Sequence, residues 1–216
     1  MLGLFARTVL ANVFEVTALS LSILTWMMVF VFDSYSANAF RLFTWWVMAM
    51  QLLYFFLAIA LPIERSKAVI LGYEELVEES PQVEAIRARR RVFLRELRHV
   101  GRILSVSMAL IFWVIFFYDR ELILPRNSDR VFGLNILQHL VPPLLFVKDN
   151  KEFHGKPKPY YSAFVAIFYS FVVLVWYLVD GTWPYRFMHD LTFRSYSMMT
   201  SLALTLIWVL HKLIIY

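Results

Sequence analysis

The fold is decided by the stretch Gly133-Leu-Asn-Ile-Leu-Gln-His-Leu-Val-Pro-Pro-Leu-Leu-Phe-Val147, which contains no formally charged side chain. It is long enough to lie within a bilayer. An ionisable side chain at that depth is costly and usually faces a polar cavity or a partner. His139, in the middle of the stretch, is therefore the first candidate functional residue of the chain.

The composition is typical of a membrane protein. The 216 residues are 60% hydrophobic, whereas soluble domains are about 45–50% apolar. The chain has no cysteine, which excludes disulfides, thiolate catalysis and cysteine-bound metals. The net charge of +5 does not indicate nucleic-acid binding, because most basic residues lie beside apolar runs. That pattern is typical of membrane topology and of contact with anionic lipid headgroups.

Several apolar runs approach the roughly 20 residues that a helix needs to cross a bilayer. They predict an all-α integral membrane protein with six transmembrane helices in one bundle, formed by a single domain over residues 1–216. The spans are expected to be helical because lipid offers no partner to unpaired backbone groups. They are expected at about 8–32, 40–62, 101–118, 131–147, 160–179 and 195–215.

The distribution of Lys and Arg predicts the orientation. With six spans, both termini share one side with the loops after the second and fourth spans, and that side holds 15 of the 21 basic residues. The termini are therefore expected in the cytoplasm. The cytoplasmic loop at 63–100 should contain a basic amphipathic helix that runs into the third span and contacts anionic headgroups. The expected membrane is an endomembrane of the ER type or the plasma membrane.

Under this topology, two polar residues from different spans reach the same leaflet. His139 lies roughly 10–12 Å, and Thr44 roughly 6 Å, below the outer end of its own span, at 1.5 Å per residue. A histidine can take the proton of a threonine hydroxyl and make it a nucleophile, so the pair predicts an acyl-transfer site. The alternative is structural: a threonine bonded to its own backbone and a histidine bonded to a neighbouring helix.

Four further polar residues are candidates for this site. Asn135 precedes the histidine by one turn and Gln51 follows the threonine by two, so either could donate to an oxyanion or make an ordinary interhelical hydrogen bond. Arg41 and Arg120 belong to the outer layer. There they could bind a lipid carboxylate, extend towards headgroups or, for Arg120, pair with a neighbouring acidic residue.

Glu15 is the other ionisable residue inside an expected span. It should lie in the opposite half of the membrane from His139, where a contact with His211 or Lys212 would close the bundle. Alternatively, Glu15 and His139 are polar stations in a transporter or channel. A third interpretation is a non-enzymatic membrane scaffold that uses the basic cytoplasmic helix.

A family resemblance takes the interpretation further. The segment Phe112-Trp-Val-Ile-Phe-Phe-Tyr-Asp-Arg-Glu-Leu-Ile-Leu-Pro125 is similar to the segment F-W-x-I-x-x-Y-D-R-E-x-I-x-P of the androgen-induced protein family. The similarity continues through Leu134-Asn135, His139, Pro143 and Gly181-Thr-Trp-Pro-Tyr185. It covers most of the chain from the second span onward.

The resemblance implies a six-span membrane hydrolase that cleaves fatty acid esters of hydroxy fatty acids without a metal or another cofactor. The family's threonine nucleophile corresponds to Thr44 and its histidine to His139. The implied enzyme is a carboxylic-ester hydrolase of the threonine type, and its partner is a lipid substrate from the bilayer. Thr44 would attack the ester carbonyl, His139 would accept its proton, and water would then release the acyl group.

Overall fold

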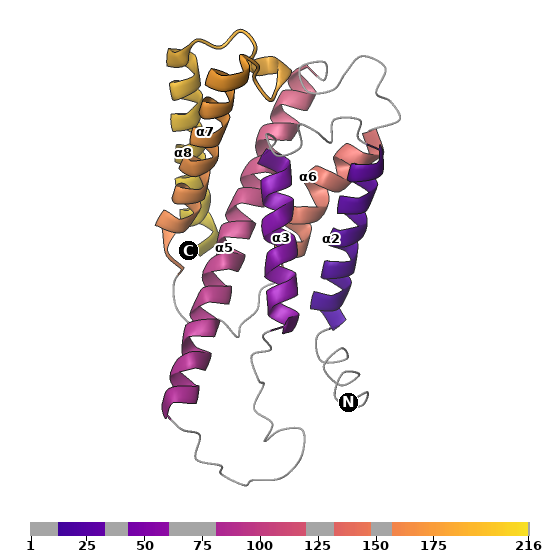
Figure 1. Cartoon of the computed structure of the whole chain (residues 1–216), viewed down its shortest axis with the longest axis vertical. Coiled ribbons are helices and arrows are strands. Elements are labelled where there is room, and N and C mark those ends of the chain that lie inside the picture. Colours follow the sequence, from indigo (N-terminus) through magenta and orange to yellow (C-terminus); the bar gives the residue numbers. More distant parts are fainter. Residues whose placement is uncertain (1–12, 33–42, 61–80, 120–131, 148–156, 216) are drawn as a thin grey trace.

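The computed structural model describes residues 13–32, 43–60, 81–119, 132–147 and 157–215. These ranges are helical and contain no strand, so the all-helical prediction is confirmed. The elements are α2 (Val13–Phe32), α3 (Phe43–Ala60), α5 (Pro81–Tyr118), α6 (Phe132–Val147), α7 (Pro159–Asp180), the short 3-10 helix η4 (Arg186–Met188) and α8 (Phe193–Ile215). Successive α-helices run in alternating directions (Figure 1).

Four of these helices, α3, α5, α7 and α8, are long and apolar enough to cross a membrane. The other two α-helices contain shorter apolar stretches, Val16–Met27 in α2 and Leu137–Phe146 in α6. The chain is therefore a multi-pass helical membrane protein. The count of six spans and the cytoplasmic termini remain predictions.

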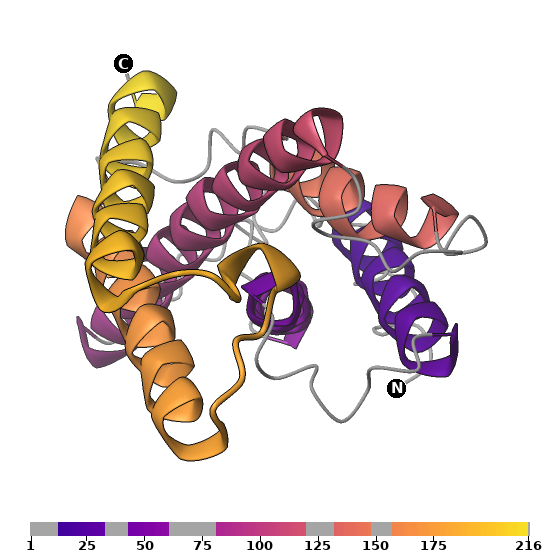
Figure 2. The same cartoon turned by 90° about the horizontal axis from the view of Figure 1, so that it is seen from above.

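The helix α3 occupies the middle of the bundle and packs against α2, α5 and α6, as the view from above shows (Figure 2). The helices α7 and α8 pair with each other and cover the other side of α5. The largest apolar cluster joins the two groups through residues of α3, α5, α7 and α8. Its buried members are Val47, Val100, Ile103, Leu104, Met108, Ala166, Ile207 and Leu210.

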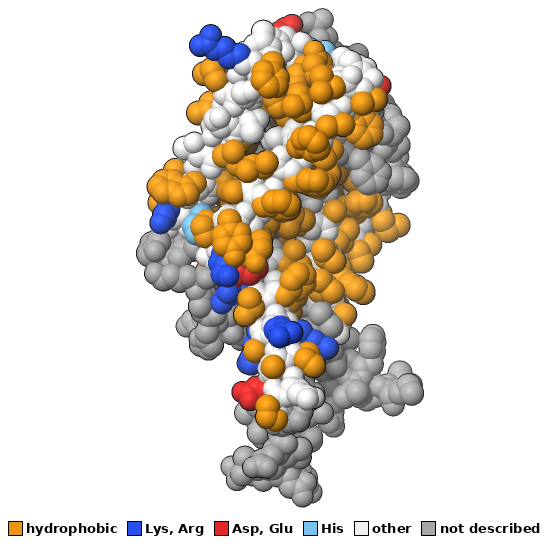
Figure 3. Space-filling model, turned by 60° about the vertical axis from the view of Figure 1, so that its left-hand side comes forward, with side chains coloured by type: hydrophobic (Ala, Val, Ile, Leu, Met, Phe, Trp, Pro, Cys, Tyr) orange, Lys and Arg blue, Asp and Glu red, His pale blue; other side chains and the backbone are white. Residues whose placement is uncertain are grey.

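The helix α5 is one continuous helix of 38 residues, about 57 Å long at 1.5 Å per residue. A hydrocarbon core is about 30 Å thick, so α5 is longer than a span requires. Its first turns extend below the other helices in Figure 1. They carry the exposed side chains of Arg89, Arg90 and Arg91. In Figure 3, basic side chains gather over this part of the molecule, below the apolar surface.

Buried polar groups join α5 to α7 near the lower end of the bundle. Glu96 of α5 accepts a hydrogen bond from the backbone N–H of Lys158 at 2.9 Å. Lys158 is the N-cap residue of α7, and a carboxylate at a helix N-terminus is favourable because the N–H groups there lack helical partners. Glu96 also pairs with Arg95 at 2.6 Å. The contact fixes the start of α7 against α5.

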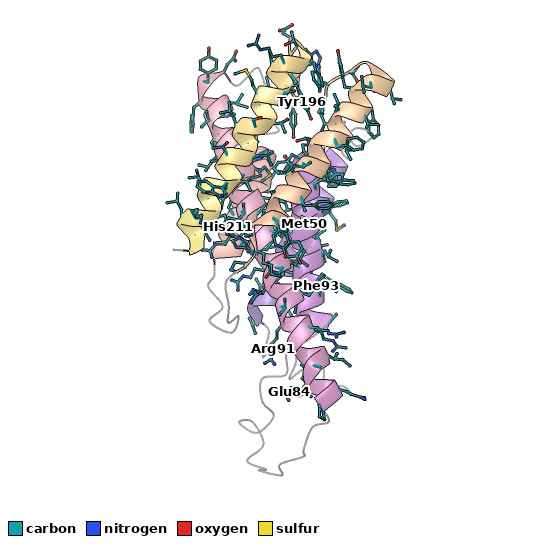
Figure 4. The ribbon with its side chains drawn as sticks, turned by 90° about the vertical axis from the view of Figure 1, so that its left-hand side faces the viewer. Met50, Glu84, Arg91, Phe93, Tyr196 and His211 are labelled. Atoms are coloured by element: carbon teal, nitrogen blue, oxygen red, sulfur yellow. The ribbon has the colours of Figure 1, made fainter. Side chains whose placement is uncertain are left out.

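Two buried histidines join α5 to α8 at the same end. Nε2 of His99 lies 2.7 Å from Nδ1 of His211, which Figure 4 shows at the lower end of α8. His211 therefore has a hydrogen-bond partner on α5. The predicted contact between His211 and Glu15 involves a side chain that lies outside the described residues.

Gly101 allows α5 to approach α6 closely. A Cβ atom at Gly101 would lie 2.5 Å from Cζ of Phe146. The Phe146 side chain is 0% exposed, and its ring centroid lies 5.6 Å from that of Tyr54 and 5.7 Å from that of Phe55. The ring cannot move aside without disturbing this packing. Small residues are typical where membrane helices approach closely.

We predict that Gly101→Ala lowers the thermal unfolding midpoint of the protein in detergent micelles. Overpacking against Phe146 should cost roughly 1–3 kcal/mol of unfolding free energy. Gly133→Ala is the matched control, because a Cβ atom there meets nothing within 4 Å. Equal midpoints for the two variants would contradict the close approach of α5 and α6.

Candidate functional site

The segment between α7 and α8 folds over the first turn of α3 (Figure 2). Gly181 ends α7 with φ of 70°, and its N–H donates to the carbonyl of Tyr177 at 2.8 Å. Glycine adopts this left-handed conformation without a Cβ clash. The turn allows Trp183 to stack on Tyr177, with ring centroids 4.0 Å apart. Tyr185 follows two residues later and points its hydroxyl at α3.

The hydroxyl of Tyr185 meets the N-terminus of α3. Its Oη accepts a hydrogen bond from the backbone N–H of Phe43 at 2.8 Å. The same hydroxyl lies beside the side chains of Thr44 and of Tyr169 from α7. The first four N–H groups of a helix have no partner within the helix. Tyr185 therefore satisfies one of them and fixes the segment between α7 and α8 to α3.

Thr44 is buried in the first turn of α3, with 6% of its surface exposed. This turn carries the positive end of the helix dipole, which favours negative charge on a nearby oxygen. Burial raises the pKa of Tyr185, because removal from water penalises the phenolate. The threonine hydroxyl therefore has a protonated phenol and helix N–H groups beside it.

His139 is also buried, with 6% of its surface exposed. Its ring lies flat on the ring of Phe112 from α5, with centroids 3.6 Å apart and an interplanar angle of 9°. Its Nδ1 has no hydrogen-bond partner in the described part of the chain. An unsatisfied buried polar group of this kind requires an explanation, such as a catalytic role.

Two prolines in α6 add further unpaired groups next to the histidine. Pro142 and Pro143 have no N–H, so the carbonyls of Gln138 and His139 lose the bonds that those positions would supply. An imidazole nitrogen and two backbone oxygens are thus left without helical partners in one short apolar helix.

Thr44 and His139 do not form a hydrogen bond with each other in the described residues. Thr44 contacts Tyr185, whereas His139 stacks on Phe112. Val47, one turn after Thr44, and Met108, one turn before Phe112, both belong to the large apolar cluster. The structure therefore buries both predicted residues but leaves the pair unassembled.

Gln51 makes an interhelical hydrogen bond. Its side chain is 2% exposed, and Nε2 donates to Oγ of Ser22 on α2 at 2.8 Å. This is one of the two roles that its position predicts. The side chain of Asn135, together with Arg41 and Arg120, lies outside the described residues.

A narrow gap lies among α2, α3 and α6. It is lined by Ser22, Thr25, Met48, Gln51, Val141 and Pro142, and its empty volume is about 190 Å³. This figure includes open space, and the gap has no room for a water-sized sphere, so it cannot hold a lipid acyl chain. The neighbouring rings of Trp26 and Trp45 lie 4.5 Å apart. Their indole N–H groups have no partner in the described ranges.

The predicted site residues did not include Phe112 and Tyr185. Phe112 stacks on the histidine and Tyr185 contacts the threonine. Both stand in sequence segments that carry the family resemblance, and this was the signal that could have identified them. Among the described residues, no group of three or more His, Cys, Asp or Glu is arranged to bind a metal ion.

Comparison with known proteins agrees with the resemblance. The model of one family, described as FAR-17a/AIG1-like protein, matches residues 11–215. This is the androgen-induced protein family, and the match extends the resemblance to the first expected span. No curated protein and no solved structure matches the chain.

We predict that Phe112→Ala destabilises the protein and exposes His139. Phe112 is 5% exposed, and its loss should cost roughly 3 kcal/mol of unfolding free energy because it leaves a cavity. Acylation of His139 by diethylpyrocarbonate, followed by mass spectrometry, should also become faster. Phe117→Ala is the control, because Phe117 is 79% exposed and its loss should change stability by less than about 0.5 kcal/mol. Similar behaviour of the two variants would exclude the stack.

Proposed function

The chain belongs to the FAR-17a/AIG1-like family, which it matches over residues 11–215, and from that premise we propose that it is an intramembrane lipid-ester hydrolase. The proposed substrates are fatty acid esters of hydroxy fatty acids. The observation that carries the proposal is the buried Thr44 hydroxyl in the first turn of α3. It has hydrogen-bond donors beside it, which is the arrangement that acyl transfer requires.

The proposed reaction has two steps. Thr44 attacks the ester carbonyl while His139 accepts its proton, and the hydroxy fatty acid leaves as an alcohol after receiving that proton. A water molecule, deprotonated by the same histidine, then attacks the acyl-threonine and releases the second fatty acid. Arg41 and Arg120 are proposed to bind the free carboxylate of the substrate, because arginine forms paired hydrogen bonds with carboxylates.

For this reaction, His139 must reach Thr44 directly or through one water molecule. Two features of α6 support such a movement. Nδ1 of His139 has no partner in the described part of the chain that would be lost. The two prolines that follow it remove helical hydrogen bonds, which makes a helix easier to bend.

The apolar surroundings suit a lipid substrate. The outer faces of the helices carry large exposed apolar side chains, including Leu140 and Leu144 of α6. Because the gap beside Gln51 is small, the acyl chains are proposed to remain largely between α6 and the lipid while the ester carbonyl approaches Thr44. A soluble enzyme would have to extract such a lipid from the bilayer first.

A non-enzymatic membrane protein is the second candidate. It is favoured by the separate contacts of Thr44 and His139 and by the gap beside Gln51, which has no room for an acyl chain. The two candidates differ in one measurable property, which is turnover of an ester that depends on the Thr44 hydroxyl.

We predict that Thr44→Ala and His139→Ala each lower kcat/KM for a fatty acid ester of a hydroxy fatty acid by about 10³-fold or more, because each removes a reacting group. Thr44→Ser should retain measurable turnover, because it keeps a hydroxyl. The assay uses purified protein in detergent micelles, with product release measured by mass spectrometry. Labelling by a fluorophosphonate probe should also disappear in Thr44→Ala.

The matched control is Ser107→Ala. Ser107 is a buried helix hydroxyl, 1% exposed, that donates to the carbonyl of Ile103 at 2.8 Å. Its loss should leave turnover within about two-fold of the wild type. Undiminished turnover and labelling in Thr44→Ala would remove the nucleophile and leave the non-enzymatic interpretation.

A further inference from the structure

We infer that Tyr185 is a catalytic residue whose hydroxyl donates a hydrogen bond to the oxyanion formed when Thr44 attacks the ester carbonyl. This inference rests on the proposed function and adds the donor for which sequence reasoning offered Asn135 and Gln51. It follows from three properties of the described residues: the position of the Tyr185 hydroxyl, the hydrogen bond that it already accepts and the packing that anchors its segment.

The Tyr185 hydroxyl is placed next to the proposed nucleophile, Thr44. Oη of Tyr185 lies 2.8 Å from the backbone nitrogen of Phe43, the residue before Thr44, and beside the Thr44 side chain. In the tetrahedral intermediate, the attacking oxygen and the oxyanion are bonded to the same carbon. A donor beside the first oxygen therefore reaches the second after a small rotation of its side chain, as an oxyanion hole requires.

The hydrogen bond that Tyr185 already makes uses its oxygen as an acceptor and leaves its proton free. A tyrosine hydroxyl has one proton to donate. The N–H of Phe43 donates to Oη, so this bond uses a lone pair of the oxygen, and the Tyr169 hydroxyl lies close by. The proton of Tyr185 is therefore available for an acceptor on the Thr44 side.

The protonation state suits a donor. Burial raises the pKa of Tyr185, so the phenol keeps its proton at neutral pH and does not act as a base. This leaves His139 as the group that removes the proton from Thr44.

The chemical step balances without any further reagent. Oγ1 of Thr44 forms a bond to the carbonyl carbon, and the π electron pair of the carbonyl moves to its oxygen. That oxyanion accepts hydrogen bonds from Tyr185 and, once the phenol has turned towards it, from the N–H of Phe43. The intermediate then expels the hydroxy fatty acid, which receives the proton held by His139. The Tyr185 proton is never transferred.

Contacts with α7 hold the segment that carries Tyr185 in place. Gly181 redirects the chain after α7, and Trp183 is anchored by its stack on Tyr177. Gln51, by contrast, lies two turns further along α3 and donates to Ser22. Among the described side chains considered for the oxyanion, Tyr185 is the one that contacts Thr44.

The test is Tyr185→Phe in the purified full-length protein. Loss of one oxyanion donor should lower kcat for the lipid ester by about 10²–10³-fold, with KM changed by less than about three-fold. Tyr196→Phe is the matched control. It removes a tyrosine hydroxyl in the same outer region, where Oη donates to the carbonyl of Ser170 at 2.6 Å (Figure 4). Its kcat should stay within about two-fold of the wild type.

A second variant separates catalysis from structure. Replacement of Tyr185 by 3-fluorotyrosine, introduced by amber suppression, keeps the hydroxyl and makes it a stronger donor. It should therefore preserve kcat at neutral pH, and the alkaline limb of the pH–kcat profile should move to lower pH because the phenol is more acidic. A purely structural tyrosine would not change the pH profile.

The outcomes distinguish the two proposals. If Thr44→Ala is inactive while Tyr185→Phe retains full kcat, the Tyr185 inference fails and the hydrolase proposal stands. If Thr44→Ala retains wild-type turnover, or the wild type has none, both fail. If Tyr185→Phe loses kcat only in proportion to a lowered unfolding midpoint, and the 3-fluorotyrosine variant shows no change in pH profile, Tyr185 is structural and the inference is overturned.

Discussion

The N–H groups in the first turn of α3 have no acceptor within the helix and need one from elsewhere in the protein. The acceptor for Phe43 is the hydroxyl of Tyr185, which comes from the far end of the chain. This bond ties α3 to the cap between α7 and α8, and the same hydroxyl contacts the Thr44 side chain. The hydroxyl that ties this end of the bundle together is therefore also a neighbour of the proposed nucleophile.

The second predicted residue depends on a different set of contacts. His139 is positioned by the flat stack on Phe112 and by the close approach of α5 and α6 at Gly101. Stacking holds one face of the imidazole but satisfies neither nitrogen, and Nδ1 has no partner in the described residues. The threonine site is thus rich in hydrogen bonds while the histidine site is held by packing.

Apolar runs predicted the helices well, because burial in lipid allows little except a helix. The continuity of α5 also follows from the pattern, since Ser80 to Arg102 keeps helical spacing into the next apolar run. The sequence pattern did not predict which side chains contact one another. Thr44 and His139 were predicted from depth along each helix, and depth does not determine rotation about the helix axis. The contacts of Tyr185 with Phe43 and of His99 with His211 join positions more than 100 residues apart, which no local pattern encodes.

The length of α5 connects two distant parts of the molecule. Its first turns extend past the bundle and carry Arg89, Arg90 and Arg91, while Phe112 lies near its other end against the histidine. No proline interrupts the helix after its first residue, and it is continuous from end to end. A binding event that tilts the arginine-bearing end of α5 would also displace its other end. The Phe112 ring, on which the His139 imidazole stacks, would move with it.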